Sequence, residues 1–232
     1  MTDDLKALVE TYQPSAATKS AMSEVSLIAT VGPSGSGKST IIKTLANSDP
    51  EFHFVVGETS RSPRPDERDG VDLHFRTQAE ILADLRNGKL TQAVRGPNGD
   101  LYCTRTDNFS RTGYNLFPLI PLGVRQFRDL PLKFFAAAFI VPATFELWQS
   151  WLKKQAQNSN WTKEKLAGRL AEAKLSYEFA LKDTQIGFVL NDEINKSAKR
   201  LAQLARQQPV DDQQRAKEIA HDNYDKLLKL LN

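Results

Sequence analysis

The sequence has little cysteine and little histidine. Its single cysteine, Cys103, excludes an internal disulfide and a zinc site built from several cysteines. The three histidines, His53, His74 and His221, lie far apart and lack the spacing of metal ligands. Because one thiol requires no oxidising environment, a reducing compartment is the simplest location.

The sequence also lacks a long hydrophobic run and a strong excess of one charge. The longest apolar run, residues 134–141, is too short to span a bilayer and predicts a buried parallel strand. The first six residues begin acidic and lack the basic-then-apolar order of a signal peptide. The formal net charge of +3 is too small to indicate nucleic-acid binding. We therefore expect a cytoplasmic protein with neither a membrane partner nor a nucleic-acid partner.

The most specific motif is a glycine-rich turn at residues 32–40, between an apolar run at 26–31 and a helix-like stretch at 41–46. This order is that of a phosphate-binding P-loop, with a strand before it and a helix after it. Glycines let backbone N–H groups converge on phosphate oxygens, and Lys38 is expected to reach the β- and γ-phosphates. The Ser39 hydroxyl is expected to bind a Mg²⁺ ion carried by them. The residues predicted to hold the nucleotide here are Gly32, Ser34, Gly35, Ser36, Gly37, Lys38, Ser39 and Thr40.

A predicted second strand, residues 53–58, runs into a segment with two arginines. Arg61 and Arg64 lie three positions apart, among the stiffening residues Pro63 and Pro65. An arginine pair at the carboxyl end of a strand suits a second phosphate, because open α/β sheets bind ligands there. A solvated polar loop would have a similar composition.

Two further runs, residues 91–95 and 101–104, flank a Gly-Pro-Asn-Gly-Asp turn. This pattern predicts a hairpin, and hence a small antiparallel insert between the second and third core strands. Gln92, Tyr102 and Thr104 are interpreted as polar residues of a pocket wall. Tyr102 is equally consistent with a strand aromatic that contacts no ligand.

Hydrophobic periodicity places the remaining elements. Residues 3–13 have the spacing of a short amphipathic helix, and residues 14–20 are interpreted as a flexible connector. Residues 115–122 are apolar, but two prolines argue against a regular central strand. The helices expected after residue 143 begin with a helix, polar turn and helix, the form of either a mobile lid or a static hairpin. The other expected elements are helices at 78–87, 144–155, 162–182 and 193–206, a strand at 186–192, and a terminal helix after Pro209.

Residues 59–75 distinguish among the many kinds of P-loop protein. This segment resembles the nucleoside-monophosphate-binding segment of guanylate kinases, which reads roughly T-T-R-x-P-R-x-G-E-x-x-G-x-D-Y-x-F. The resemblance extends more weakly to Asn191 and covers most of the chain between its two ends. The matching residues are Thr59, Arg61, Pro63, Arg64, Glu67, Gly70, Asp72 and Phe75.

The resemblance implies a fold and a division of the chain. The fold is α/β, a P-loop NTPase-type three-layer parallel sheet with a small antiparallel insert, a helical lid, and extra N- and C-terminal helices. The expected parts are an N-terminal helix and connector at 1–24, a guanylate kinase-like domain at 25–208 and a C-terminal helix at 209–232. Within the domain, the acceptor-binding insert is placed at 59–105 and the lid at 144–170.

The resemblance also implies ATP-dependent phosphoryl transfer to a nucleoside monophosphate, GMP or dGMP, with ATP and Mg²⁺ as cofactors, in a monomer or homodimer. Arg61 and Arg64 would grip the acceptor phosphate, and Arg169 would be a lid arginine between the donor and acceptor phosphates. Asn191 would lie beside adenine and so belong to the cofactor-binding set. The catalytic residues would be Lys38, Arg64 and Arg169, the substrate-binding residues Arg61, Arg64, Gln92, Tyr102 and Thr104, and the metal-binding residue Ser39.

Several positions depart from the family pattern where the acceptor would bind. The tyrosine of D-Y-x-F is Leu73, and the glutamate that reads guanine through N1–H and the 2-amino group is best matched by Gln92. The two aspartates of the family's Asp-x-Asp align with Pro118 and Ile120. Residues 115–122 contain no carboxylate. Other nucleotides or a phosphorylated sugar stay open as acceptors. A second hypothesis is a guanylate-kinase-like module that has weak or no kinase activity and binds nucleotide or a partner.

Overall fold

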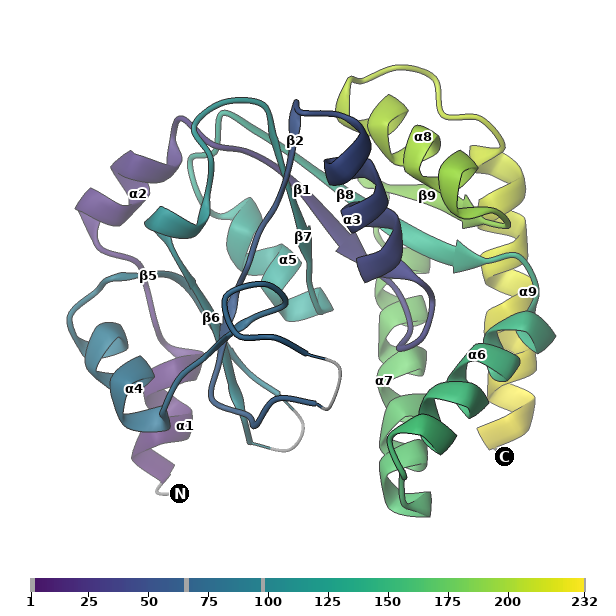
Figure 1. Ribbon diagram of the computed structural model, residues 1–232, viewed down its shortest axis with the longest axis horizontal. Coiled ribbons are helices and arrows are strands. Elements are labelled where there is room, and N and C mark those ends of the chain that lie inside the picture. The colour runs from purple at the N-terminus through teal and green to yellow at the C-terminus, as the bar shows by residue number, and fades with distance from the viewer. Residues whose placement is uncertain (1–2, 65–66, 97–98, 232) are drawn as a thin grey trace. The chain divides into compact units, whose positions relative to one another are not determined.

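The apolar run at residues 26–31 forms the middle strand of a five-stranded sheet. In this computed structural model, which describes residues 3–64, 67–96 and 99–231, the strand order is β2-β7-β1-β8-β9 (Figure 1). β1 is buried at every position, and β8 runs parallel to β9. Continuous apolar sequences fit strands that are covered on both faces. The strands are β1 (Ser26–Val31), β2 (Phe52–Phe54), β7 (Tyr114–Pro118), β8 (Phe134–Pro142) and β9 (Ile186–Asn191).

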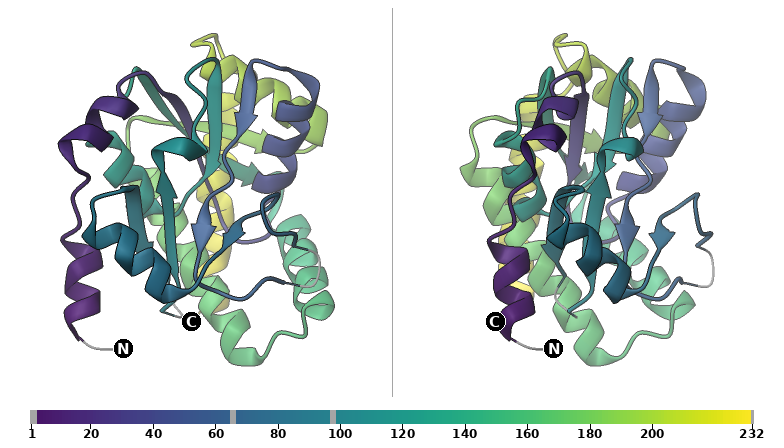
Figure 2. Two further views of the ribbon diagram at one scale, coloured as in Figure 1. Left: turned by 60° about the vertical axis from the view of Figure 1, so that its left-hand side comes forward. Right: turned by 90° about the vertical axis from the view of Figure 1, so that its left-hand side faces the viewer.

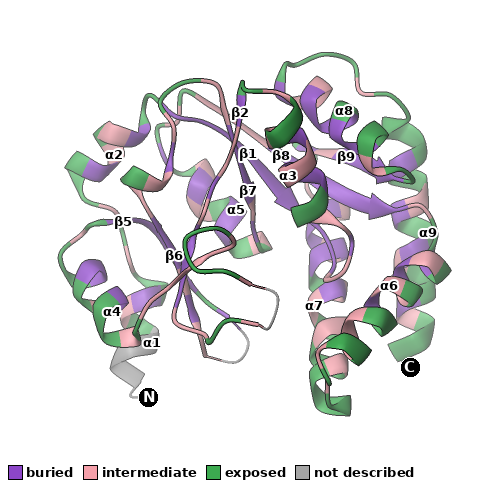
Figure 3. Cartoon of the chain, viewed as in Figure 1, coloured by how far each residue is buried: buried purple, intermediate pink, exposed green. Residues whose placement is uncertain are grey.

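Helices pack in pairs beside this sheet. α3 packs with α8, and α7 packs with α9, while α8 and α9 both contact β9. Figure 3 shows buried strands next to helices whose outer surfaces are exposed. The predicted α/β class is confirmed. The helices of this part are α3 (Lys38–Ser48), α6 (Phe145–Asn158), α7 (Lys163–Lys182), α8 (Ile194–Ala205) and α9 (Gln213–Leu231).

The contacts within the chain divide it into two compact units. The phosphate loop belongs to the second unit, and the arginine segment belongs to the first. The first unit contains residues up to 27, 55–115 and 122–135, and the second contains 28–54, 116–121 and 136–232.

The first unit carries a four-stranded sheet in the order β4-β3-β6-β5. β6 is antiparallel to β3 and β5, but β4 is parallel to β3, so the insert is a mixed sheet rather than the antiparallel one predicted. The chain turns at Gly70, with φ +72°, and the His74 N–H then donates to the Gly57 carbonyl at 2.8 Å. The sequence analysis did not predict that the chain comes back after Gly70 to pair β4 with β3. The strands are β3 (Glu58–Thr59), β4 (His74–Phe75), β5 (Leu90–Arg95) and β6 (Leu101–Arg105).

The N-terminal helix packs on this small sheet. α1 (Asp3–Glu10) contacts β5, and it lies beside β5 and α4 (Gln78–Arg86) in both views of Figure 2. The Tyr12 hydroxyl donates to the Leu90 carbonyl at 2.7 Å and accepts from the Leu90 N–H at 3.2 Å. An apolar cluster seals the contact; its buried members are Val9, Ile81, Leu85, Leu90, Ala93, Leu101 and Cys103.

The expected flexible connector at residues 14–20 is wrong, because α2 (Ala16–Met22) begins there. The Ser15 hydroxyl caps this helix by accepting from the Thr18 N–H at 3.1 Å. The Thr18 hydroxyl also donates to the Gly88 carbonyl at 3.0 Å. A serine that was interpreted as a linker residue is therefore a helix start.

Two other element predictions also change. The expected strand at 53–58 divides, since β2 ends at Phe54 in the central sheet and β3 begins at Glu58 in the small sheet. The apolar run at 115–122 ends as a strand at Pro118. Pro121 then opens α5 (Pro121–Arg128), which the sequence analysis did not predict, because proline is well tolerated at the first helical position. A short 3₁₀ turn, Thr106–Asn108, links β6 toward β7.

Candidate active site

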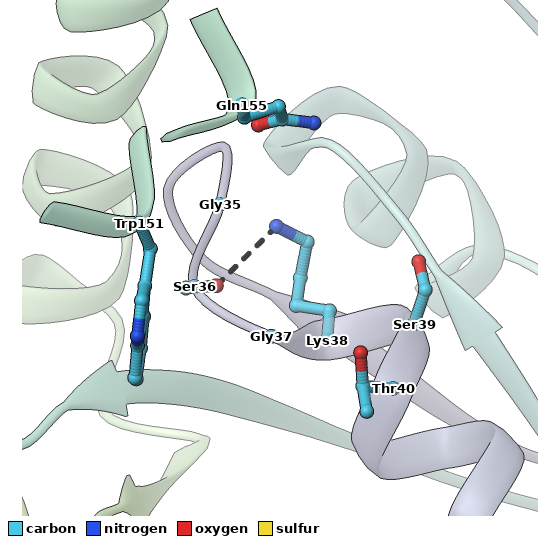
Figure 4. Close-up of a pocket in the computed structure, with 8 residues that line it drawn as sticks. All are labelled: Gly35, Ser36, Gly37, Lys38, Ser39, Thr40, Trp151 and Gln155. Carbon is cyan, nitrogen blue, oxygen red and sulfur yellow. Dashed lines mark hydrogen bonds between the residues drawn. The ribbon is translucent and has the colours of Figure 1, made fainter. Parts of the chain in front are cut away.

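The phosphate loop and the first turn of α3 form one side of a pocket in the second unit. The pocket has a volume of about 300 Å³, and Figure 4 shows the side chains that line it. Six of the eight predicted loop residues lie in this lining; Gly32 and Ser34 do not. The lining residues are Gly35, Ser36, Gly37, Lys38, Ser39, Thr40, Trp151 and Gln155.

Two glycines are required by the shape of the loop. At Gly32, a Cβ would lie 2.9 Å from the Ile140 carbonyl oxygen of β8. Gly37 has φ +86°, and a Cβ there would lie 2.5 Å from Nδ2 of Asn191. The loop can therefore approach β8 and β9 only because side chains are missing at these positions.

Asn191 lies beneath the loop, at the end of β9. Its Nδ2 donates to the Ser36 carbonyl at 2.8 Å, and its Oδ1 accepts from the Ser197 hydroxyl at 3.2 Å. The side chain is only 2% exposed and is not part of the pocket lining. These contacts suit a residue that holds the phosphate loop in shape, while its predicted place beside adenine stays a prediction.

Lys38 is folded back onto its own loop. Its ammonium donates to the carbonyls of Gly32 at 2.7 Å and Pro33 at 2.9 Å, and to the Ser36 hydroxyl at 3.5 Å (Figure 4). Burial lowers the pKa of Lys38 to about 8, with Glu172 opposing the shift and Arg169 adding to it. An incoming phosphate would restore the preference for the charged amine, since an opposite charge favours it.

Helix α6 forms the other side of the pocket, and the sequence analysis did not identify its contribution. The Trp148 indole N–H donates to the Ser34 carbonyl at 2.8 Å, and a Cβ at Gly35 would lie 3.7 Å from the Leu152 backbone. Trp151 and Gln155 then face the loop from the same helix (Figure 4). Their spacing from Trp148, three and seven positions, is that of one helical face, which was the available signal. The helix assigned to a lid is thus hydrogen bonded to the loop in its first half.

Arg169, the predicted lid arginine, lies on α7 in the same unit. Its Nη1 is 2.7 Å from the Glu172 carboxylate, and its guanidinium lies 5.6 Å from the centre of the Trp161 ring. Both Arg169 and Glu172 act electrostatically on Lys38. The structure therefore brings two predicted catalytic cations into one electrostatic environment, with Glu172 as an additional acidic neighbour.

In the first unit, Glu67 organises the arginine segment. It accepts from both terminal nitrogens of Arg61 at 2.6 Å and from the Arg64 N–H at 2.9 Å, and its carboxylate lies 3.7 Å from the Arg64 guanidinium. Burial would raise the pKa of Glu67, but the hydrogen bonds and charges of the two arginines hold it below its usual value. The Arg61 guanidinium also lies 5.5 Å from the centre of the Phe75 ring. Of the stiffening prolines named above, Pro65 lies outside the described residues.

The three predicted pocket-wall residues lie on one face of the small sheet. Gln92 pairs with Thr104 and Tyr102 pairs with Val94, so alternation places all three predicted side chains on the same side. The hydroxyls of Thr104 and Thr91 are 2.7 Å apart. Burial would lower the pKa of Arg61, but Glu67, with a smaller effect from the Tyr102 hydroxyl, raises it above its usual value. The predicted base-binding and phosphate-binding residues are thus neighbours within the first unit.

The stretch that aligns with the family's Asp-x-Asp is apolar, and two of its side chains are exposed. Ile120 is 45% exposed and Leu122 is 46% exposed, next to the end of β7 at Pro118. Among residues 3–64, 67–96 and 99–231, no group of three or more His, Cys, Asp or Glu side chains is placed to hold a metal ion. Ser39, the predicted metal residue, lies exposed in the pocket lining. The side-chain oxygens of the pocket lining come from hydroxyls and the Gln155 amide rather than from carboxylates.

A glycine-rich loop between the first strand of an α/β sheet, β1, and the helix that follows it, α3, defines the class of P-loop nucleotide-binding proteins. Residues 24–208 match the family model described as guanylate kinase. The chain belongs to the guanylate kinase family, whose members are nucleoside monophosphate kinases.

Curated relatives and a solved structure agree with this family. The chain is 30% identical over 181 residues to the guanylate kinase of Methylobacillus flagellatus, covering 76% of this chain and 86% of that protein. It is 30% identical over 184 residues to the guanylate kinase of Nocardia farcinica, covering 77% and 92%. The crystal structure of guanylate kinase from Anaplasma phagocytophilum has the same fold, with a TM-score of 0.57, 20% identity, and coverage of 79% and 85%. Helices α1, α2 and α9 lie outside the matched family region.

Across the described part of the chain, no helix combines the length and apolar character needed to cross a membrane.

Replacing Gly37 with alanine is expected to destabilise the protein by about 1–2 kcal/mol, because alanine is disfavoured at positive φ. The new methyl group would also push against Asn191 and distort the loop, so we expect nucleotide affinity to fall about ten-fold, the effect of one displaced hydrogen-bonding group. Denaturant unfolding and ADP calorimetry measure both effects.

Gly168→Ala is the matched control. Gly168 lies within α7 and has nothing within 4 Å of an added Cβ. This change is expected to stabilise the protein by about 0.5–1 kcal/mol through helix propensity. Equal behaviour of the two variants would contradict the requirement for glycine at residue 37.

Proposed function

We propose that this chain transfers the terminal phosphoryl group of ATP to GMP or dGMP. The single observation that carries the proposal is the pocket lined by Lys38 and the glycine-rich loop, which has room for phosphate. The pair of arginines on Glu67 supplies a second phosphate-binding group in the same chain. The family match spans both segments.

The proposed reaction is a direct transfer between phosphates. An oxygen of the acceptor phosphate attacks the γ-phosphorus of ATP while the bond from that phosphorus to the β–γ bridging oxygen breaks, giving ADP and a nucleoside diphosphate. Little covalent chemistry is required of the protein, so positioning and charge neutralisation dominate. Lys38 and the loop N–H groups would hold the donor, Arg61 and Arg64 the acceptor, and Arg169 the transferred group.

Mg²⁺ would be held in the pocket by Ser39 together with phosphate oxygens and water. The donor set fits this ion, because Mg²⁺ prefers oxygen ligands and usually keeps several waters. When bound, it would neutralise charge on the β- and γ-phosphates.

A coupled ADP-release assay with ATP, Mg²⁺ and the common monophosphates tests the function. We expect turnover with GMP or dGMP above that with CMP and UMP. Calorimetry of ATP and GMP binding is run on the same protein. Tight binding of both without product at high enzyme concentration would favour the nucleotide-binding module over the enzyme.

The affinity for ADP is expected to fall about ten-fold between pH 7 and pH 9. At pH 9 most of Lys38 is neutral in the free protein, because its pKa is lowered to about 8, and binding must first take up a proton. Calorimetry with EDTA present, in buffers of different ionisation enthalpy, measures the affinity and the proton uptake. Glu172→Gln should move the midpoint to lower pH, since Glu172 favours the charged amine. A constant affinity across this range would contradict the assignment.

The lowered pKa of Lys38 also determines how the free energy of unfolding depends on pH. The folded pKa lies below the usual value of 10.5, so the unfolded chain binds more protons between about pH 8 and 10.5. In that window the contribution of Lys38 makes the free energy of unfolding rise with pH.

A further inference from the structure

The small sheet has one apolar face and one face with polar groups. Ala93 and Cys103 belong to the apolar cluster beneath α1 and α4. Gln92 and Thr104 alternate with them, so they lie on the opposite face. Gln92 is 3% exposed and Thr104 is fully buried, which makes this face an enclosed polar surface rather than a solvated one.

The Gln92 amide nitrogen is buried and has no hydrogen-bond partner in the described part of the chain. Its neighbours on the sheet do not supply one, because the Thr104 hydroxyl pairs with Thr91, whose own hydroxyl also interacts with the Thr104 carbonyl at 3.0 Å. Buried donors are normally paired, and an unpaired one calls for an explanation. A ligand group that accepts a hydrogen bond would satisfy this nitrogen.

The chemistry of an amide restricts what that ligand is. A glutamine side chain presents N–H donors and one carbonyl acceptor side by side, and therefore pairs with an edge that offers an acceptor next to a donor. A 6-oxopurine has this edge in O6 and N1–H, whatever stands at position 2. Adenine offers N1 as an acceptor next to its 6-amino donor, so an amide pairs with that base only when its two ends are exchanged. A carboxylate only accepts, so it needs two adjacent donors, which N1–H and a 2-amino group provide.

We propose that Gln92 binds the O6 and N1–H edge of the acceptor base, so that 6-oxopurine monophosphates are substrates with or without a 2-amino group. This inference rests on the proposed function and narrows its substrate class. IMP and GMP are then comparable acceptors. Gln92→Glu converts the site into one that requires the 2-amino group.

The test compares kcat/KM for GMP, IMP and AMP in the full-length protein. We expect IMP to be used within about ten-fold of GMP, since no hydrogen bond to the 2-amino group is lost. Gln92→Glu is expected to change the GMP-to-IMP ratio about 10–100-fold in favour of GMP, the effect of one buried hydrogen-bonding partner. Gln208→Glu, the same change in an exposed loop, is the matched control and should leave the ratio unchanged.

The outcomes separate the inference from the function beneath it. Turnover of GMP with rejection of IMP by more than about 100-fold would overturn the reading of Gln92 and leave the kinase function intact. AMP used as well as IMP would overturn the pairing of Gln92 with O6 and N1–H, because the amide must then be turned over to accept from a 6-amino group. Turnover of no monophosphate would overturn both proposals. If Gln92→Glu melts early, calorimetry of GMP and IMP binding to the unmodified protein decides the question without that variant.

Discussion

Replacing Lys38 with methionine is expected to lower kcat for phosphoryl transfer about 10³-fold, as for removal of a group that stabilises transition-state charge. Methionine keeps much of the aliphatic length but removes the charge proposed to hold the phosphates. It also removes the hydrogen bonds to the Gly32 and Pro33 carbonyls. A coupled assay at saturating ATP and acceptor measures kcat, and a thermal melt reports whether the loop still folds.

Lys199→Met is the charge-matched control for this experiment. Lys199 lies on α8 in the same unit, and its side chain is 69% exposed beside Asp211. An exposed ion pair contributes little, so activity should stay within about two-fold of the unmodified protein. A Lys38→Met protein with nearly full activity would show that the phosphate loop does not carry the chemistry.

Replacing Arg64 with methionine is expected to lower kcat/KM for the acceptor about 10²-fold, the effect of losing one charged contact to phosphate. Arg64 is the better choice of the two arginines for mutation. Its side chain is 38% exposed, whereas that of Arg61 is 13% exposed and bonded twice to Glu67. Removing Arg61 would leave a partly buried carboxylate with less compensation and would confuse stability with binding.

The decisive readout for Arg64→Met is a comparison of the two substrates. The KM for GMP should rise, and the affinity for ADP should stay unchanged, because the phosphate loop is intact. Arg68→Met removes an exposed arginine from the same segment and serves as the control. An equal change in the KM for GMP in both variants would mean that Arg64 does not bind the acceptor phosphate.

The loop side of the pocket was largely predictable because its main residues are contiguous. Residues 32–40 contain the glycines, the lysine and the hydroxyls of one turn, and a phosphate loop requires only local backbone geometry and the start of one helix. Trp151 and Gln155 were missed because more than a hundred positions separate them from the loop. Their place in the pocket depends on the packing of α6, which no local pattern specifies.

The missed elements have local explanations that only the fold makes visible. α2 begins at a serine cap inside a stretch with the composition of a linker. α5 begins at Pro121. A proline argues against a regular strand, but it is well tolerated in the first turn of a helix. In each case the residue allows two conformations, and contacts with distant segments select one of them.

The sequence by itself determined the class of fold, the phosphate loop with Lys38, and the arginine segment, because each depends on residue types at fixed short spacings. Only the tertiary structure decided that Asn191 braces the loop, that α6 closes one side of the pocket, and that the Gln92 amide is buried without a partner. These features join residues that are far apart along the chain. Their geometry follows from packing and hydrogen bonding in the folded state, which local periodicity does not encode.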